Sequence, residues 1–119
     1  MKPACVESDE ALWTFALPLD DLWEGEMIGL CLEADDVLLV RFARDEIRAY
    51  DNHCPHAGAR LSEGHLTHTT LRCPIHHWEF DVRSGNGVNP RNCKLRSFPV
   101  KLVDGAVLVQ LRVPGVERR

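Results

Sequence analysis

Two short motifs place a cysteine and a histidine close together in the chain. The first is Cys-Pro-His at 54–56 and the second is Cys-Pro-Ile-His at 73–76, with sixteen residues between them. Thiolate and imidazole are both good ligands for zinc, copper and iron. The prolines stiffen the two turns. Two such loops facing each other would form a pocket with two cysteine and two histidine ligands.

The order of the ligands separates two kinds of metal site. A closed site of two cysteines and two histidines suits zinc, but zinc modules usually pair like ligands, Cys-x2–4-Cys followed by His-x3–5-His. Here each motif mixes the two types. A mixed pair in each loop favours a two-iron cluster in which two histidines replace two cysteines on one iron. A zinc-binding interaction module stays open as an alternative.

The amino-acid sequence around the motifs resembles that of the Rieske [2Fe–2S] family. The resemblance is carried by the motif pair and by CPHAGA at 54–59, LSEG at 61–64 and CPIHHWEFD at 73–81, and it covers roughly residues 13–111. It implies a base of antiparallel sheets with a small inserted subdomain whose two loops hold one [2Fe–2S] cluster. It also implies that Cys54 and Cys73 bind the inner iron, and that His56 and His76 bind the outer iron near solvent.

Further residues near these loops are candidates for docking or for contact with the ligands. They are Ala57, Gly58, His77, Trp78 and Pro90. His77 stands where the family commonly has glycine, and Trp78 either joins the docking face or shields the cluster. Either Pro90 or Pro99 could occupy the family's cluster-covering position. For Cys93 we expect packing rather than ligation, since four ligands are already supplied.

The same resemblance bears on the reduction potential. High-potential Rieske proteins add a disulfide between the loops, at the positions that Ala59 and Ile75 occupy here, and hydroxyl donors at the positions of Trp78 and Phe80. Fewer hydrogen bonds to the cluster sulfurs leave the reduced form less stabilised. We therefore expect a potential near about −150 mV, at the low end of the Rieske range.

The rest of the chain predicts an all-β fold, an antiparallel sandwich or barrel. Asp104-Gly105 between two β-branched runs is a strong hairpin signal, and Ala34-Asp35-Asp36 suggests a second hairpin. A capped helical turn is expected over residues 20–25, with Asp20 as N-cap and Gly25 as the stop. The expected strands are 13–17, 27–32, 37–42, 47–50, 100–103 and 106–109. We expect one domain over 1–119, a loop-rich cluster-binding insert at approximately 51–99 and a flexible tail at 114–119.

Net charge and cysteine content limit the classes of partner and the cellular compartment that we expect. The 119 residues have a net charge of −4, which disfavours nucleic acid and anionic membrane surfaces and favours a basic patch on another protein. The start of the chain has no apolar signal region. Five cysteines, an odd number, suit metal ligands or free thiols in a reducing compartment. We expect a monomeric cytoplasmic protein that binds no membrane.

These features together predict an electron carrier without catalytic activity of its own. The chain has neither room for a mononuclear-iron domain nor a Gly-rich dinucleotide fingerprint. It would accept electrons from a flavin-dependent NADH reductase and deliver them to an oxygenase component. DLWEGEM at 21–27 and GVNPRNC at 87–93 resemble ferredoxins of toluene monooxygenase systems, which implies a diiron hydroxylase acting on aromatic or alkene substrates. The alternatives are the ferredoxin of a ring-hydroxylating dioxygenase and a small subunit of the nitrite-reductase type.

Overall fold

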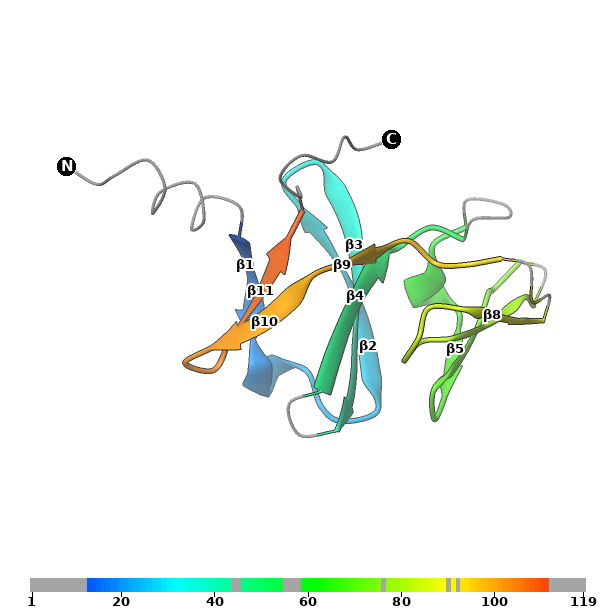
Figure 1. The fold of residues 1–119 in the computed structure, drawn as a ribbon, viewed down its shortest axis with the longest axis horizontal. Helices are drawn as coiled ribbons and strands as arrows, with labels where there is room; N and C mark the ends of the chain where they lie inside the picture. Colours follow the sequence, from blue (N-terminus) through cyan, green and yellow to red (C-terminus); the bar gives the residue numbers. More distant parts are fainter. Residues whose placement is uncertain are drawn as a thin grey trace.

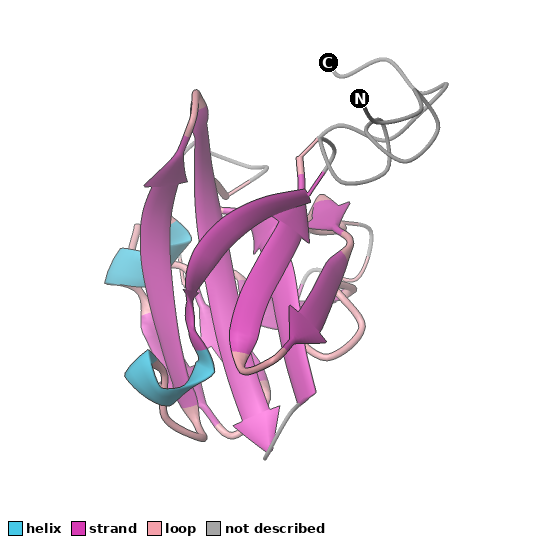
Figure 2. Ribbon diagram, turned by 90° about the vertical axis from the view of Figure 1, so that its left-hand side faces the viewer, coloured by secondary structure: helices cyan, strands magenta, loops and turns pink. Residues whose placement is uncertain are grey.

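A computed structural model describes residues 13–43, 46–54, 59–75, 77–89, 91 and 93–111. In these ranges the chain forms three antiparallel sheets, and helix is confined to two short 3-10 turns (Figures 1 and 2). The predicted all-β class is confirmed. No helix in the described ranges is long and apolar enough to cross a membrane. The expected tail at 114–119 lies outside the described residues.

The first sheet has the order β1-β11-β10. Its strands are β1 (Trp13–Pro18), β10 (Val100–Val103) and β11 (Ala106–Gln110). The hairpin between β10 and β11 turns at Asp104 and Gly105, with φ of +50° and +79°. Positive φ at both central residues is what a type I′ turn requires, so the predicted Asp-Gly hairpin is confirmed.

The second sheet has the order β2-β3-β4-β9. Its strands are β2 (Glu26–Leu32), β3 (Asp35–Ala43), β4 (Glu46–Asp51) and β9 (Ser97–Phe98). The predicted hairpin between β2 and β3 is confirmed, with a tighter loop: Leu32 pairs with Asp35, and Glu33 has a φ of +56°. The loop thus has only two residues, which is why Asp35 and Asp36 belong to the strand.

The third sheet, of order β5-β6-β7-β8, lies in the chain between β4 and β9. Its strands are β5 (His65–Thr67), β6 (Thr70–Arg72), β7 (Glu79–Asp81) and β8 (Gly87–Asn89). The sequence predicted only a loop-rich stretch here, because three residues are too few to display alternation of apolar and polar positions. The other short element is η2 (Leu61–Glu63), which precedes β5.

The second sheet is the middle layer between two hydrophobic cores. Strand β3 shows why: Val37 and Leu39 face the core shared with the first sheet, and Leu38 and Val40 face the core shared with the third. All four are fully buried. A strand covered on both faces reads as a continuous apolar run rather than an alternating one. We call the core between the second and third sheets core 2.

The expected helical turn over residues 20–25 is wrong in its bounds. The turn is η1 (Leu19–Asp21), its cap residue is Pro18, and no side chain caps it. Leu22 already has extended dihedral angles and is buried in the core between the first two sheets. Burying Leu22 ends the turn early. The Arg41 guanidinium then donates to the Leu22 carbonyl at 2.6 Å, in place of further helix.

Candidate functional site

The first cysteine motif begins where β4 ends. Asp51 closes the strand, two residues follow, and Cys54 enters a loop whose neck is held by two contacts. The Cys54 backbone N–H donates to the Ala59 carbonyl at 2.8 Å, and His53 forms an isolated antiparallel bridge with Arg60. Cys54 is buried in core 2. The predicted residues His56, Ala57 and Gly58 of this loop lie outside the described residues.

The second motif leaves β6 and returns into β7. The Cys73 N–H donates to the Trp78 carbonyl at 2.7 Å, and the His77 N–H donates to the Cys73 carbonyl at 3.1 Å. Cys73 is completely buried. His77 is exposed and has a φ of +60°, a left-handed conformation that glycine adopts more easily. His76 lies outside the described residues.

The two loops bring their thiols into the same core. Cys54 and Cys73 both pack in core 2, with apolar side chains of η2, β6 and β7. Neither forms a disulfide. Two buried thiols from separate closed loops are a suitable half of a soft-metal site, because a thiolate is unfavourable in an apolar core unless a cation compensates it. Among the described residues no three metal-ligating side chains come together. The two predicted histidine ligands are outside that set.

The remaining candidates fall in different places. Trp78 and Cys93 are both half-buried and pack against core 2. Pro90 is outside the described residues. Pro99 connects β9 to β10, and its carbonyl accepts from the Gln110 N–H at 2.9 Å, so it is built into the base of the fold.

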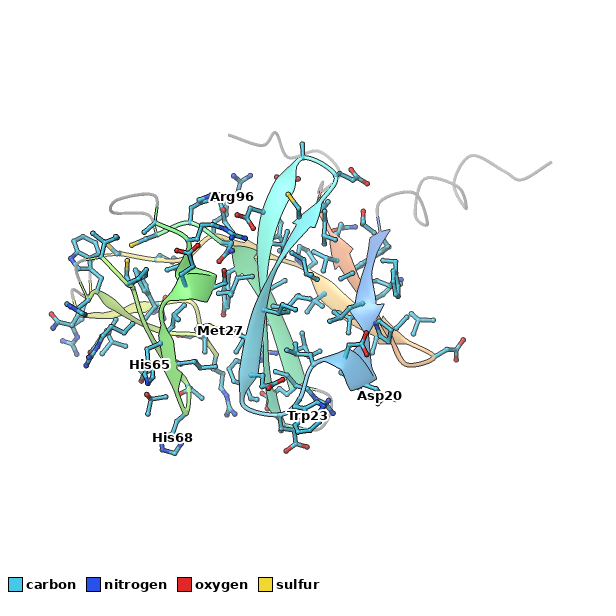
Figure 3. All side chains as sticks on the ribbon, turned by 180° about the vertical axis from the view of Figure 1, so that it is seen from behind. Asp20, Trp23, Met27, His65, His68 and Arg96 are labelled. Atoms are coloured by element: carbon cyan, nitrogen blue, oxygen red, sulfur yellow. The ribbon has the colours of Figure 1, made fainter. Side chains whose placement is uncertain are left out.

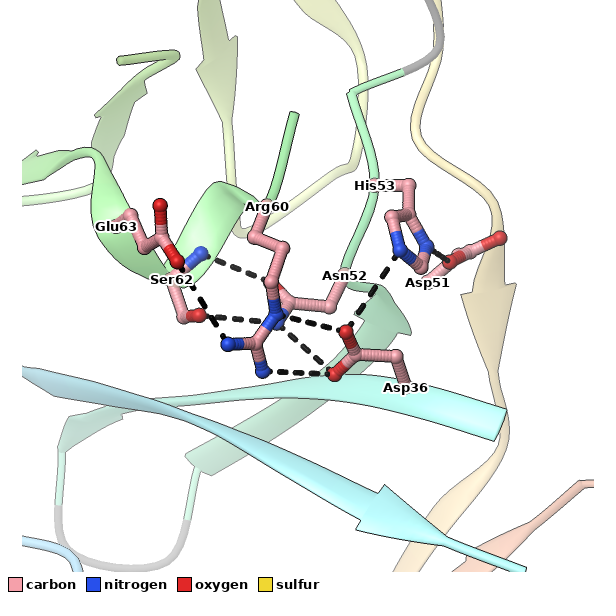
Figure 4. A network of polar contacts seen from close by, with 7 residues as sticks. All are labelled: Asp36, Asp51, Asn52, His53, Arg60, Ser62 and Glu63. Atoms are coloured by element: carbon pink, nitrogen blue, oxygen red, sulfur yellow. Dashed lines mark hydrogen bonds and ion pairs between the residues drawn. The ribbon is translucent and has the colours of Figure 1, made fainter. Parts of the chain in front are cut away.

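A polar network that the sequence did not reveal supports the first loop (Figure 4). Its centre is Asn52, which has no exposed surface. The Asn52 amide nitrogen donates to Asp36 Oδ1 at 3.1 Å and to Ser62 Oγ at 2.9 Å, and its oxygen accepts from the Ser62 N–H at 2.8 Å. The Asn52 backbone also bonds to Asp36 and Leu61. Every polar group of Asn52 thus ties the loop to β3 and η2.

Asp36 extends this network to the neck of the loop. Its carboxylate accepts from Arg60 Nε at 2.8 Å, and His53 Nε2 lies 3.7 Å away. The hydrogen bond from Arg60, and secondly that from Asn52, hold the pKa of Asp36 below its usual range against the opposing effect of burial. His53 Nδ1 also contacts Asp51 at 3.0 Å. His53 is therefore a structural link at the neck of the first loop.

One hydrogen bond connects the base directly to the third sheet. The Tyr50 hydroxyl, on β4, donates to the Val82 carbonyl at 2.6 Å just after β7. Burial raises the pKa of Tyr50 to about 12. Gly85 has a φ of +85°, and a Cβ there would lie 3.0 Å from the Tyr50 ring. The tyrosine thus requires a small residue opposite it.

Two histidines outside the motifs lie on the hairpin formed by β5 and β6. His65 is an exposed residue of β5, and His68 is in the turn between β5 and β6 with a φ of +58°. Figure 3 shows both at the lower end of the third sheet. His65 pairs with Arg72, the residue before Cys73, and borders one surface pocket together with Cys73, Pro74 and His77.

Comparison with known proteins identifies the family. Residues 12–99 match the family model of the Rieske [2Fe-2S] domain. The chain belongs to the Rieske [2Fe-2S] family. The cofactor of a Rieske domain is one [2Fe–2S] cluster, and the two buried thiols held at closed loop necks fit it.

Ferredoxins of oxygenase systems are among the Rieske proteins that this chain resembles. The chain is 42% identical to the ferredoxin component of the alkene monooxygenase system of Xanthobacter autotrophicus (strain ATCC BAA-1158 / Py2), over 87% of this chain and 84% of that one. It is 34% identical to the ferredoxin component of the naphthalene 1,2-dioxygenase system of Pseudomonas putida, over 83% and 95%. A structure of reduced oxygenase with oxidized ferredoxin in carbazole 1,9a-dioxygenase matches with a TM-score of 0.74 and 28% identity, over 83% and 93%.

Proposed function

We propose that this Rieske ferredoxin carries single electrons to an oxygenase component and catalyses no reaction by itself. The observation that carries the proposal is the convergence of Cys54 and Cys73, from two closed loops, in one buried core of a Rieske domain. With His56 and His76 they would hold the cluster. When bound, the cluster supplies a site that accepts and releases one electron.

The residues of the chain have three tasks in this function. The bonds from Cys54 to Ala59 and from Cys73 to Trp78 hold the two loops closed, so the thiolates keep one geometry in both redox states. Core 2 excludes water from the thiol side of the site. The Asn52 network fixes the first loop to the base. A rigid surrounding reduces the reorganisation that accompanies a change of charge.

The partners follow from the relatives. An oxygenase component would receive the electron, and a flavin-dependent NADH reductase would supply it in the cytoplasm, to a monomeric carrier. A diiron hydroxylase acting on an alkene or aromatic substrate is the better candidate, because the alkene monooxygenase ferredoxin is 42% identical and the naphthalene dioxygenase ferredoxin 34%. The second candidate is a ring-hydroxylating dioxygenase.

The first test is electron paramagnetic resonance of the dithionite-reduced protein, with iron and labile-sulfide analysis. We expect two irons and two sulfides and a rhombic signal whose average g lies below the free-electron value. His76→Ala should lose this signal. His77→Ala is the matched control and should keep it, because the described contact of His77 with Cys73 is made by its backbone. Zinc in place of iron, or the reverse behaviour of the two variants, would contradict the proposed ligand set.

The second test follows the electron. NADH with the reductase should bleach the visible absorbance of the ferredoxin, and the separately purified oxygenase component should restore it. A midpoint potential above zero, measured by potentiometric titration, would contradict the expected low potential. Failure of the oxygenase to reoxidise a fully reduced ferredoxin would contradict the carrier role.

A further inference from the structure

The charges of this acidic protein are segregated along the chain. Residues 1–43 contain ten acidic and two basic residues, whereas residues 52–99 contain three acidic and six basic residues. Between Asp81 and Asp104 there are five basic residues and no acidic one. Residues 52–99, which contain the two cysteine motifs, therefore have a formal charge of +3, and the remaining residues have −7.

The fold places part of this basic stretch beside both cysteine loops. Asn89, at the end of β8, pairs with Glu79, the residue that follows the second loop. The chain then returns antiparallel to itself, since the Gly87 N–H donates to the Cys93 carbonyl at 2.8 Å and Lys94 forms a bridge with Asn86. It reaches the end of β4, three residues before Cys54, where the Asp51 N–H donates to the Arg96 carbonyl at 2.8 Å.

The returning segment is anchored inward and basic outward. Leu95 is buried in core 2 and Cys93 packs against that core, which contains Cys54 and Cys73. Three exposed side chains alternate with these anchors along the segment. We call them the basic edge: Arg91, Lys94 and Arg96. Arg96 lies between the middle sheet and the cluster-binding part of the chain (Figure 3).

The acidic residues of residues 52–99 are already compensated. Glu63 is paired with Arg60 at 3.7 Å and Glu79 with Arg72 at 3.3 Å. Asp81 accepts hydrogen bonds from the Arg83 N–H and from Ser84 Oγ. Within the described ranges, Arg91 and Lys94 make no ion pair and no side-chain hydrogen bond. Their positive charges are available to a partner.

Two exposed apolar residues lie on the second cysteine loop and on β8, the strand from which the returning segment begins. Ile75, in the second loop, is 56% exposed, and Val88, the central residue of β8, is 44% exposed. A protein interface commonly has an apolar centre and a polar, charged rim. Ile75 and Val88 would supply the apolar centre of such an interface, and the basic edge would supply its charged rim.

We propose that the basic edge is the docking rim for a carboxylate-rich surface of the oxygenase component. The proposal rests on the proposed function and names the charge of its partner surface, which is the opposite of what the net charge of this chain predicts. An acidic partner surface would attract the basic edge and repel the acidic base, so the encounter orients the cluster toward the acceptor. Such steering suits a small and short-lived electron-transfer interface.

Single charge reversals test the proposal at equal net charge. Arg91→Glu, Lys94→Glu and the control Lys101→Glu each change the net charge from −4 to −6. Lys101 is exposed on β10 of the first sheet, where its Nζ lies 4.4 Å from the Trp13 ring centroid. The dissociation constant is measured between the oxidised ferredoxin and the oxidised oxygenase component encoded with it, at low and high salt. The visible spectrum confirms that each variant retains its cluster.

At low salt we expect roughly a tenfold weaker complex for Arg91→Glu and Lys94→Glu, and less than a twofold change for Lys101→Glu. The difference should shrink at high salt, where the Debye length falls to about 3 Å at 1 M. The proposal would be overturned if all three variants bound the oxygenase component with the affinity of the wild type. It would also be overturned if Arg91→Glu or Lys94→Glu bound it more tightly. Weakening by all three to the same degree would show a net-charge effect and would also overturn it.

Carbodiimide cross-linking tests the chemistry of the partner surface directly. The chain has only three lysines, Lys2, Lys94 and Lys101. The reagent joins a lysine amine to an activated carboxylate as an amide. In the complex with the oxygenase we expect mass spectrometry to find Lys94 joined to an oxygenase carboxylate, and Lys101 unjoined. Cross-links through Lys101 with none through Lys94 would overturn the proposal.

The two proposals fail in distinguishable ways. If the wild-type protein reduces the oxygenase and the edge variants bind as well as it does, the carrier role stands and the basic edge is wrong. If the wild type binds through the edge but passes no electron, the carrier role fails and the docking rim stands. Weakening confined to the reductase, with oxygenase binding unchanged, overturns the assignment of the edge to the oxygenase.

Discussion

The base of this fold and its cluster-binding part are stabilised in different ways. In the base, β2 and β3 pair over seven positions and enclose a core built from apolar side chains of two sheets. In the cluster-binding part, β5 and β6 pair over three positions, and so do β6 and β7. The core beneath them contains the two cysteines themselves. Hydrophobic burial thus accounts for the base, and the cofactor and a few polar contacts supplement it elsewhere.

The cluster-binding part depends on the base for its hydrophobic core. Its core is shared with β3 and β4, through Leu38, Val40 and Tyr50. Three-residue strands have too few ladder hydrogen bonds to be stable alone. We therefore expect local opening of the third sheet at a lower free energy than opening of the base.

Removal of the cluster should produce the largest difference between the two regions. In Cys73→Ser we expect loss of the visible absorbance and at least a hundredfold faster amide exchange at Leu71 and Phe80 of the third sheet. Amides in the paired part of β2 and β3 should change less than tenfold. Amide hydrogen exchange followed by NMR measures both, and Cys31→Ser, at an exposed site on β2, should change neither. Equal loss of protection in both regions would mean one cooperative unit.

Asn52→Ala should have the next largest effect. It leaves the part-buried Ser62 N–H without its acceptor and the Asp36 carboxylate without one of its donors, which costs about 2–3 kcal/mol of unfolding free energy. Thr14→Ala is the control, since its exposed hydroxyl donates to Glu33 on the base side and should matter by less than about 0.5 kcal/mol. Urea unfolding by circular dichroism gives both values. If Asn52→Ala lowered the unfolding free energy as little as Thr14→Ala does, the network would not stabilise the fold.

Tyr50→Phe should have the smallest effect, about 1 kcal/mol at pH 7, because it removes one bond between the regions. Tyr50 is the only tyrosine, so absorbance at 295 nm titrates it alone. Its folded pKa of about 12 lies above the ordinary tyrosine pKa of 10.0. Its contribution is therefore complete below pH 10 and declines as the pH rises from 10 toward 12. The Phe variant should lack this decline, and a midpoint near 10 in the folded protein would contradict the burial argument.

Local patterns made parts of the fold predictable. Asp104-Gly105 specified a hairpin because adjacent residues alone set its dihedral angles. The long apolar runs of β2 and β3 were visible for a similar reason. The third sheet was missed because its three-residue strands carry no pattern. The helical turn at Asp20 was misjudged because burial of Leu22 outweighed the local preference for a cap.

The candidate site divides along the same line. The two motifs were visible because ligand type and spacing are chemical properties of adjacent residues. The Asn52 network was not visible in the sequence, because Asn52 lies 16 residues and Arg60 lies 24 residues beyond Asp36 in the chain. An asparagine before a loop also has many other uses. Only a fold that brings β3 beside η2 gives these residues their role.

The sequence by itself determined the ligand types, the hairpins, the all-β class and the family, because each depends on residues that are near neighbours in the chain. The tertiary structure decided which loops close at which residues, how Asn52 fixes the first cysteine loop to the base, how Tyr50 connects the base to the third sheet, and where the charges lie. The net charge of −4 is a sum over all residues and has no direction. Docking depends on the field at one surface, and only the return of the chain from β8 past Cys93 places Arg91 and Lys94 on a segment that packs against the core containing Cys54 and Cys73.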